Sequence, residues 1–529
     1  MAPSPNVIVT AAFSPSPPSL PSTRPCGQPP TYRSNPENGG EGQQPASMPL
    51  NETPPLPRPG GQRSRAPRIA LLLPSSLASG RIGALATARL PTLAKQYGNI
   101  CCVWLGHQPV ILMSGFQAVK EVLVNHEEAF SERPSSIIVK TVGRERGIVV
   151  SNGHTWKQQR RFAVVTLRKL GLGKKGMEHQ IQEEAQQLVE TFACAKGQPI
   201  DPSLPITNAV SNVICAVTFG HRFSLQDEKF QKLVEAVDVG LKFIFSSFHI
   251  LYEMFPWIMK HLPGPHKKAI AAFELVLSFA REETEKHKEQ SSFHEPRDFI
   301  DFYVLQMEKR RNEPNSTYDE ENLVQCIHDF FIAGTETTAT SLRWALLLLT
   351  NHPDIQDKVY KEIEDVFSSS CSICYQDIKK LPYTNAVIHE MQRSKYNLLV
   401  GLPRQCTKDV KVNGYLIPKG AYILADLRSV LLDPERWETP EEFNPNHFLD
   451  KDGHFVAREE FLPFGAGARL CPGEQLANIE IFIFLTSLLR AFRLQLPEGV
   501  NKLSPDAILG LTLSPHPYKI CAVPHRSSS

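Results

Sequence analysis

One cysteine of the chain lies in a glycine-rich loop that suits a metal-bound thiolate. The loop follows the pattern F-x-x-G-x-R-x-C-x-G, with the defining residues Phe464, Gly467, Arg469, Cys471 and Gly473. A cysteine thiolate can hold haem iron as an axial ligand and favours cleavage of the O–O bond. Gly465 and Gly467 permit the tight turn that such a sulfur needs. A helix that begins near Glu474 would aim its N–H groups at the thiolate of Cys471 and lower its pKa.

Three other residues of this loop suit a flat, negatively charged cofactor. Gly473 would let the backbone approach a flat ring closely, because it has no side chain. Phe464 can shield the sulfur from water, and Arg469 can pair with a haem propionate. A lone cysteine is usually an inert core residue, but the complete pattern favours iron ligation by Cys471.

A polar turn interrupts an apolar helix in the middle of the chain. Residues 333–338, with the sequence AGTETT, lie between the apolar runs FFIAG and WALLLL. Glycine inside a helix costs about 1 kcal/mol relative to alanine, and threonine hydroxyls can bond to the preceding turn and bend a helix. A turn that merely faces solvent is disfavoured by the apolar flanks. We therefore expect a local groove in which O2 and water can approach the iron.

Two further pairs of residues each share one face of a helix. Glu390 and Arg393 are three residues apart, and Trp156 and Arg160 are four residues apart. Taken alone, the pair of Glu390 and Arg393 would more often be a surface ion pair worth roughly 0.3–0.5 kcal/mol. Spacing alone therefore does not decide what either pair does.

These motifs occur together, in the same order, in a known family. From about Leu90 to the C-terminus, the chain resembles the cytochromes P-450, specifically the microsomal animal enzymes that oxidise drugs and fatty acids. The resemblance implies a mainly α fold with a small β part, built as a single large haem domain. It also implies haem b (iron protoporphyrin IX) as the cofactor, with Cys471 as the proximal ligand of the iron.

The resemblance assigns roles to the polar turn and to the basic residues. Thr337 would stabilise the iron-bound oxygen species, and Glu336 would help to deliver protons. Trp156 and Arg160 would hydrogen-bond a haem propionate. Further propionate partners would be three arginines, Arg133, Arg404 and Arg469.

The resemblance also makes Glu390 and Arg393 a buried structural lock that shapes the haem core. The third partner of this lock is commonly an arginine in a P-x-R-F element. This chain has Pro445-Asn446-His447-Phe448 at that place. His447 would then take the third position, and its interaction would be weak at neutral pH because histidine is mostly uncharged there.

The implied reaction is a monooxygenation, in which one oxygen atom of O2 enters the substrate and the other leaves as water. Its electrons would come from NADPH through the flavoprotein NADPH–cytochrome P-450 reductase, with cytochrome b5 as an optional donor. The enzyme would lie at the cytoplasmic face of the endoplasmic reticulum membrane. One basic cluster is equally compatible with a docking face for an acidic reductase and with an ordinary solvated surface. Its members are Arg161, Arg168, Lys169, Lys174 and Lys175.

The segments that would line the substrate pocket are mostly apolar, which predicts a lipophilic substrate. They are Ser135–Val149, Leu241–Leu262, Phe330–Thr337, Asn397–Leu402 and Leu509–Ser514. Stretches such as DPSLPITNAVSNVICAVTFGHRF resemble the branch that epoxidises and hydroxylates polyunsaturated fatty acids. We therefore expect arachidonate-like lipids or xenobiotics as substrates.

Composition divides the 529 residues into three parts. Residues 1–68 are rich in Pro, Ser and Gly, which predicts a disordered head; residues 69–89 form an uncertain connector, and residues 90–526 form the haem-thiolate monooxygenase domain. The formal net charge is only +2, so no nucleic-acid partner is expected. The 11 cysteines are odd in number and scattered, which favours a reduced, intracellular protein.

Membrane attachment is expected to be peripheral. The chain contains no run of about 18–20 apolar residues, so no spanning helix is predicted. The resemblance implies that microsomal members begin with a spanning helix. An alternative N-terminus or an imperfect gene model would account for the difference. A dense apolar segment between Phe243 and Ile258 could instead dip into one leaflet.

Two helices and one hairpin are predicted around these motifs. Ser316 and Thr317 are expected to cap a long helix that ends at Asn351, and a second helix should begin at Thr384. Two short strands should flank residues 106–109.

Two other functions stay open: a haem-binding protein without turnover, and a haem-free scaffold with a proline-rich tail.

Overall fold

The computed structural model describes most of the chain from residue 93 onward. The described residues are 68–70, 93–105, 108–170, 175–244, 246–290, 295–367, 372–398 and 400–525. They belong to one unit, which spans Arg63–Ser529. The head predicted for residues 1–68 lies outside the described residues except for Arg68, and so does most of the connector predicted for residues 69–89.

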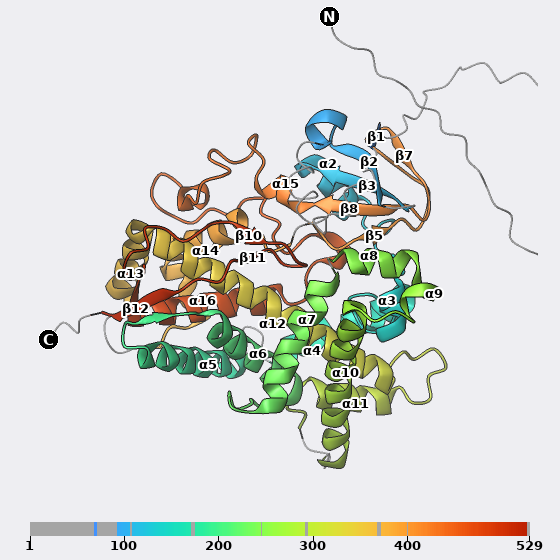
Figure 1. Ribbon diagram of the computed structural model, residues 1–529, viewed down its shortest axis with the longest axis horizontal. Coiled ribbons are helices and arrows are strands. Elements are labelled where there is room, and N and C mark those ends of the chain that lie inside the picture. The colour runs from blue at the N-terminus through green and yellow to red at the C-terminus, as the bar shows by residue number, and fades with distance from the viewer. Residues whose placement is uncertain are drawn as a thin grey trace, which may run out of the picture. The chain divides into compact units, whose positions relative to one another are not determined.

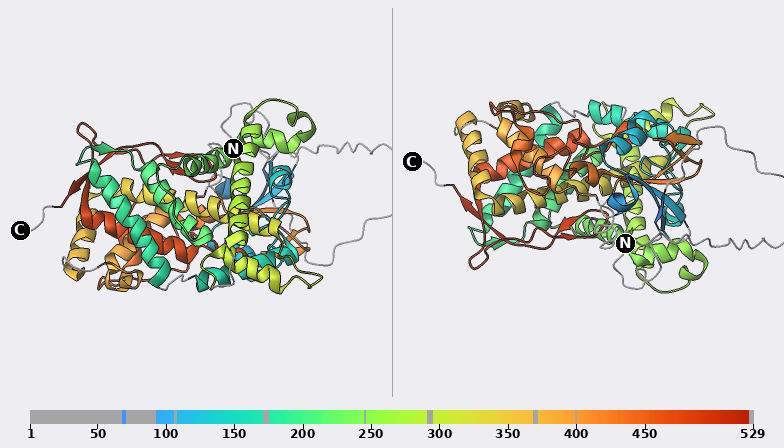
Figure 2. Two further views of the ribbon diagram at one scale, coloured as in Figure 1. Left: turned by 90° about the horizontal axis from the view of Figure 1, so that it is seen from below. Right: turned by 90° about the horizontal axis from the view of Figure 1, so that it is seen from above.

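A mixed sheet gathers strands from both ends of this unit. In spatial order, its strands are β1 (Arg68–Ala70), β2 (Ile100–Leu105), β3 (Gln108–Ser114), β8 (Tyr422–Asp426) and β5 (Arg404–Gln405). β1 and β2 are parallel, as are β3 and β8, whereas β2 and β3 form an antiparallel pair. The predicted hairpin is thus confirmed, with β3 already starting at Gln108. The blue and orange strands of this sheet gather at one end of the unit in Figures 1 and 2.

Helices fill most of the rest of the unit, which confirms the mainly α fold with a small β part. The helices of the first half are α2 (Phe116–Lys120), α3 (Ile137–Val142), α4 (Gly153–Lys169), α5 (Lys175–Cys194), α6 (Ser203–Phe219), α7 (Glu228–Ile244), α8 (Ser247–Met254) and α9 (Pro256–Met259). Those of the second half are α10 (Pro265–Gln290), α11 (Phe299–Lys309), α12 (Glu320–Asn351), α13 (Pro353–Phe367), α14 (Pro382–Ser394), α15 (Leu427–Leu431) and α16 (Glu474–Ala491).

Short elements connect these helices. One π-helical turn and three 3-10 turns occupy Glu121–Asn125, Tyr375–Lys380, Pro445–Phe448 and Gly467–Arg469. The remaining strands are β4 (Pro199–Ile200), β6 (Val410–Val412), β7 (Tyr415–Ile417), β9 (Phe492–Gln495), β10 (Ala507–Ile508), β11 (Ser514–Pro515) and β12 (Ile520–Pro524). Among the described residues, none of the helices has the length and apolar character needed to cross a membrane.

The long helix α12 runs through the centre of the helical part (Figure 1). Its 32 residues extend about 48 Å at 1.5 Å per residue. It ends at Asn351 as predicted, but the predicted caps at Ser316 and Thr317 are wrong. The cap is Asp319, whose side chain accepts the N–H of Asn322 at 2.8 Å. The hydroxyl of Thr317 is instead engaged by a side chain of α4, so a tertiary contact replaces the local cap.

The start of α14 also differs from the prediction. It begins at Pro382, two residues before the predicted Thr384. Proline fits the first turn of a helix because the N–H that it lacks would have no partner there. The side chain of Thr384 hydrogen-bonds the carboxylate of Glu362 at 2.6 Å, which joins α14 to α13.

Close packing against α6 explains the glycine in the polar turn of α12. A Cβ atom on Gly334 would overlap Cδ1 of Ile214 on α6. The helix continues without a break through this turn, so Gly334 allows a close helix contact rather than a bend. The buried apolar side chains of α5, α6, α12 and α16 form the main core around this contact.

Candidate active site

The cysteine loop is closed by its own backbone and needs its glycines. The N–H of Cys471 donates to the carbonyl oxygen of Phe464 at 3.1 Å. Gly465 and Gly467 have φ angles of 77° and 69°, which side chains rarely adopt. A Cβ atom on Gly467 would also overlap the carbonyl oxygen of Leu123. The loop therefore has one defined shape that presents the sulfur.

The sulfur of Cys471 lies beside the first turn of α16. Gly473 is the N-cap of this helix, and a Cβ atom on it would lie 3.9 Å from Sγ of Cys471. Burial raises the pKa of the Cys471 thiol, although the N–H groups of Gly473 and Glu474 and the charge of Arg160 lower it. The N–H groups at the start of the helix lower this pKa as predicted, but burial outweighs them. A metal ion bonded to the sulfur would supply the missing positive charge.

The predicted propionate partners form a cluster of guanidinium groups. Burial lowers the pKa of Arg469 to about 9 and that of Arg404 to about 10, and the charges of neighbouring arginines add to this effect. The pKa of Arg133 is lowered by burial and by the charges of Arg404, Arg469 and Arg160. Arginine nevertheless stays protonated in proteins. The cluster is therefore a set of buried like charges that favours a bound anion.

Backbone carbonyl groups hold two of these arginines. The acceptors of the Arg133 side chain are Val149, Leu402 and Pro403. Those of the Arg469 side chain include Ser131, Ile148 and Ser151. The side chain of Arg404 is buried and makes no hydrogen bond or ion pair with any described residue. The guanidinium groups of Arg133 and Arg469, which the backbone holds in place, thus lie near the guanidinium group of Arg404.

Trp156 lies in the same place and has a free donor. The guanidinium carbon of Arg469 lies 3.9 Å from the centre of the Trp156 ring. The indole Nε1 of Trp156 is buried and has no hydrogen-bond partner among the described residues. Arg160, one turn further along α4, donates to the carbonyl oxygen of Leu470 in the cysteine loop. The structure therefore brings Trp156 and Arg160 together with the arginine cluster and the loop.

The polar turn of α12 presents a hydroxyl on an open side of the helix. Ala333 is exposed although it lies in the middle of the long helix. The hydroxyl of Thr337 donates to the carbonyl oxygen of Ala333 at 2.7 Å. The carboxylate of Glu336 accepts hydrogen bonds from Thr512 at 2.8 Å and from Thr340 at 3.1 Å. Thr337 and Glu336 are thus held by different partners.

The five predicted pocket segments meet in two places. An apolar cluster near α3 combines three of them, and its members include Ile138, Phe243, Tyr252 and Ile332. The other two segments pair through a bridge between Leu398 and Thr512. Asn397 then donates to the carbonyl oxygen of Thr337 at 2.8 Å, which connects this pair to α12.

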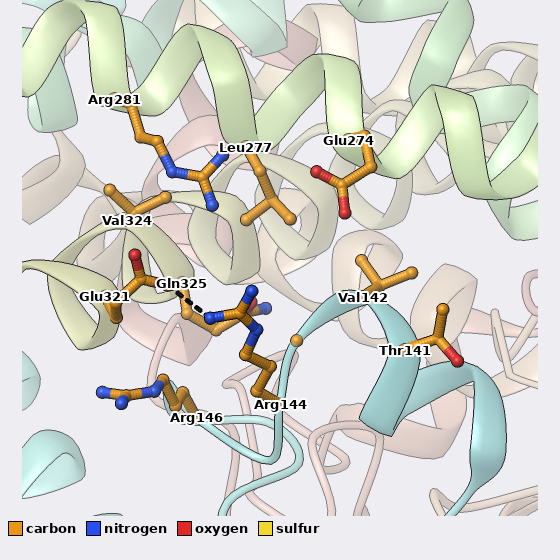
Figure 3. Close-up of a pocket in the computed structure, with 11 residues that line it drawn as sticks. Thr141, Val142, Arg144, Arg146, Glu274, Leu277, Arg281, Glu321, Val324 and Gln325 are labelled. Atoms are coloured by element: carbon orange, nitrogen blue, oxygen red, sulfur yellow. Dashed lines mark ion pairs between the residues drawn. The ribbon is translucent and has the colours of Figure 1, made fainter.

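A small cavity of about 70 Å³ adjoins the first of these segments, between α3, α10 and α12 (Figure 3). Arg144 and Arg281 extend into it from opposite sides. Arg144 pairs with Glu321 at 3.9 Å, whereas Arg281 makes no ion pair with any described residue. Glu274 also lines the cavity and makes no ion pair with any described residue, so the charge of Arg281 is matched by a carboxylate in the same lining.

The three residues predicted as a structural lock are in contact. Glu390 and Arg393 are completely buried and form two hydrogen bonds of 2.7 Å. His447 contacts the same carboxylate through Nδ1 at 3.1 Å. Arg393 also donates to the backbone carbonyl group of Leu431 at the end of α15, at 2.7 Å, and to that of Pro440 in the segment that follows, at 2.9 Å.

Several residues of the site were missed in the sequence. Asn152 accepts hydrogen bonds from the backbone of Arg133 and from the side chain of Arg469. Trp437 lies between the guanidinium groups of Arg393 and Arg458. No local pattern indicates these contacts. Asp329 accepts two N–H groups of the 148–149 segment, and its charge inside an apolar stretch could have drawn attention.

Comparisons with known proteins identify the family. The family model for cytochrome P450 matches residues 82–522. The chain is 44% identical over 430 residues to cytochrome P450 2J2 of Homo sapiens, which covers 81% of this chain and 85% of that protein. Cytochrome P450 2J5 of Mus musculus is 44% identical over 82% of this chain and 86% of its own length. Cytochrome P450 2C8 of Homo sapiens is 40% identical over 82% and 88%, respectively.

The matches decide between the functions that the sequence left open. The family uses haem b, and its members insert an oxygen atom from O2 into a substrate with electrons from NADPH. This favours an enzyme over a haem-binding protein without turnover and over a haem-free scaffold. The chain therefore belongs to the cytochrome P450 family, and it is a haem-thiolate monooxygenase.

Proposed function

We propose that residues 90–526 form the monooxygenase domain and that Cys471 is the proximal ligand of the haem iron. The observation that carries this proposal is the sulfur of Cys471 in a rigid loop beside a cluster of buried arginines. The two propionate groups of haem b would offset two of the four positive charges of the cluster, and one of them would accept a hydrogen bond from Nε1–H of Trp156. Arg133, Arg160, Arg404 and Arg469 would hold these carboxylates, so the residues fit the cofactor.

Haem, when bound, supplies the chemistry of O2 activation. The chain binds the substrate, delivers protons and excludes water. The hydroxyl proton of Thr337 is engaged by the carbonyl group of Ala333. Its oxygen can therefore accept a hydrogen bond from a water molecule. Glu336 lies in a network with the hydroxyl groups of Thr340 and Thr512, which can pass protons toward this turn.

The substrate is a lipophilic molecule, which we assign to polyunsaturated fatty acids and, alternatively, to xenobiotics. The apolar cluster of Ile138, Phe243, Tyr252 and Ile332 supports a lipophilic ligand. The resemblance of the stretch DPSLPITNAVSNVICAVTFGHRF to the branch that oxidises polyunsaturated fatty acids favours such a lipid as the substrate. Epoxidation or hydroxylation of such a lipid is therefore the preferred reaction.

The enzyme acts at the cytoplasmic face of the endoplasmic reticulum membrane, with NADPH–cytochrome P-450 reductase and, optionally, cytochrome b5. Arg161, Arg168 and Lys169 are exposed on α4 and can attract an acidic reductase. The helices α8 and α9 carry exposed apolar side chains, among them Phe248 and Trp257, which is 64% exposed. This surface would contact the lipid, so the protein should pellet in part with microsomes and leave them in high salt or mild detergent.

The reduced, carbon-monoxide-bound spectrum tests the ligand assignment. Wild-type protein should give the red-shifted band of thiolate-ligated haem, and Cys471→Ser should lose it. Cys194→Ser is the matched control, because Cys194 is exposed on α5, and it should keep the band. A thiolate band that survives Cys471→Ser would overturn the assignment. Product formation from a panel of fatty acids and xenobiotics, with added reductase, then distinguishes the substrate classes.

A further inference from the structure

A second cavity, of about 440 Å³, lies between the end of α14, the start of α15, α12 and the segment around β10. Its wall on α12 is Trp344, which follows Thr337 by two helical turns, or about 10 Å. None of the residues assigned to the haem or to proton delivery lines it. Its volume falls within the range of about 300–1,000 Å³ that is typical of small-molecule sites. The cavity is therefore a candidate site of its own.

Three cationic side chains line this cavity, and Arg393 is paired with Glu390, which leaves Lys395 and Arg428. Nζ of Lys395 donates to the carbonyl oxygen of Pro505 at 2.9 Å and lies 4.8 Å from the centre of the Trp344 ring. Arg428 makes no side-chain hydrogen bond or ion pair with the described part of the chain. Burial lowers the pKa of Lys395, and the charge of Arg428 adds to this effect. Asp506, the one acidic residue in the lining, forms no ion pair with either cation.

Two hydroxyl groups in the same lining lack partners. The hydroxyl oxygen atoms of Ser394 and Tyr396 are buried, and neither has a hydrogen-bond partner among the described residues. Tyr396 as a whole is only 6% exposed. A buried hydroxyl without a partner costs free energy, so a ligand that accepts hydrogen bonds would satisfy both groups. A carboxylate can accept several such bonds at once.

The rest of the wall is apolar. Trp344, Ala507, Leu509 and Leu513 line it with hydrocarbon and aromatic surface. An inorganic anion would leave this surface in contact with water. A neutral apolar molecule would leave one positive charge unmatched, because Asp506 is the one acidic residue in the lining beside Lys395 and Arg428. Only a ligand that has both a negative charge and an apolar part matches the lining.

We propose that this cavity binds a monocarboxylate amphiphile, a molecule with one carboxylate and a short apolar tail. The carboxylate lies between Lys395 and Arg428 and accepts hydrogen bonds from the hydroxyl groups of Ser394 and Tyr396. The tail packs against Trp344 and Leu513. This site is independent of the proposed haem ligands, because it shares no residue with them.

Titration calorimetry with octanoate tests the proposal on the haem-loaded protein. An iron-binding azole is added first, so that the substrate pocket beside the haem is blocked. Octanoate should then bind to one saturable site. Lys395→Met and Arg428→Met should each weaken binding at least tenfold, and Tyr396→Phe should weaken it about threefold. Lys411→Met is the matched control, since Lys411 is an exposed lysine on β6, and it should bind octanoate like the wild type.

Further measurements separate the contribution of the charge to binding from that of the apolar tail. Lys395→Arg keeps the positive charge and should retain most of the affinity, which guards against a loss of binding caused by misfolding. Octan-1-ol and inorganic phosphate should each bind at least tenfold more weakly than octanoate. Octanol that binds as tightly as octanoate would overturn the role of the cations, and phosphate that does so would overturn the role of the tail. Absence of saturable binding, or equal binding by the wild type and by Lys395→Met, would overturn the site itself.

Discussion

Nδ1 of His447 lies 3.1 Å from a carboxylate oxygen of Glu390, and both side chains are buried. Nε2 of the same ring lies 3.2 Å from the backbone N–H of Thr439, from which it accepts a hydrogen bond. Nε2 therefore carries no proton, so Nδ1 must carry it and donate to Glu390. A neutral histidine thus holds the third position of the lock.

This geometry predicts that His447→Leu destabilises the fold. The variant removes one of the two donors to this oxygen of Glu390, to which Arg393 still donates, and it also removes the acceptor of the Thr439 N–H. The combined cost should be about 1–3 kcal/mol. His447→Asn retains an N–H donor near the position of Nδ1 and should recover part of the loss. The free energy of unfolding in urea, followed through the haem spectrum, measures both effects.

The control for His447 is His454→Leu, because His454 is an exposed residue of a nearby loop. It should change the free energy of unfolding by less than about 0.5 kcal/mol. If His447→Leu and His454→Leu had equal effects, the third position of the lock would contribute nothing to stability.

Trp156→Phe should speed the loss of haem. The Nε1–H of Trp156 has no partner among the described residues, so the proposed partner is a propionate group of the cofactor. Loss of one hydrogen bond to a charged group should raise the dissociation rate about tenfold. The ring beneath Arg469 stays aromatic in this variant, which keeps the packing. Transfer of haem to an excess of apomyoglobin measures the rate.

Trp257→Phe is the matched control for this experiment, because Trp257 lies on the exposed surface of α9. Its rate of haem transfer should equal that of the wild type. Equal rates for Trp156→Phe and the wild type would show that the indole N–H does not hold the cofactor.

The motifs that could be predicted are those whose chemistry is local. The loop around Cys471 and the pair of Glu390 and Arg393 are each contained in one short stretch. Their residue types and spacing therefore carry most of the information, and the structure has both in the expected places. The ends of α12 illustrate the limit of local patterns. Asn351 ends the helix as predicted, but the side chain of Thr317 bonds to Gln158, so Asp319 is the cap.

The partners that could not be predicted come from distant parts of the chain. Asn397 donates to the carbonyl oxygen of Thr337, although the two are 60 residues apart. Asn152 contacts Arg469 across 317 positions. The burial that raises the pKa of the Cys471 thiol could not be predicted for the same reason, since it depends on how distant parts of the chain pack around the sulfur. The spacing of residues along the chain does not indicate which distant side chains come into contact.

Thr337→Ala should uncouple electron use from product formation. The threonine hydroxyl is fixed by Ala333, and its oxygen faces the open side of α12. Without this acceptor, water at the turn is no longer held in place for proton transfer, so the yield of product per NADPH should fall several-fold. Thr337→Ser keeps the hydroxyl and should retain most of the yield. Simultaneous measurement of NADPH, product and hydrogen peroxide checks this, and an unchanged yield for Thr337→Ala would contradict the role.

Glu480 on α16 should make the stability of the enzyme depend on pH. Its side chain is buried, with a residue exposure of 1%, and its Oε1 has no hydrogen-bond partner among the described residues. Burial raises its pKa from the ordinary value of 4.5 to about 8, and a hydrogen bond from Thr338 opposes this only in part. Between these two pH values the folded protein keeps a proton that the unfolded chain has lost. The contribution of Glu480 to the free energy of unfolding is therefore most favourable below pH 4.5. It becomes less favourable as the pH rises toward 8, by up to about 1.4 kcal/mol per pH unit.

Glu480→Gln removes this titration while keeping a side chain of similar size. The variant and the wild type should have similar free energies of unfolding near pH 5, and the variant should become the more stable of the two as the pH approaches 8. Urea unfolding at several pH values between 5 and 8 measures the difference. Glu498→Gln is the control, because Glu498 is exposed in a loop and its replacement should leave the pH dependence unchanged. Parallel curves for Glu480→Gln and the wild type would mean that Glu480 titrates normally, since only a difference in pKa between the folded and unfolded states can produce a slope.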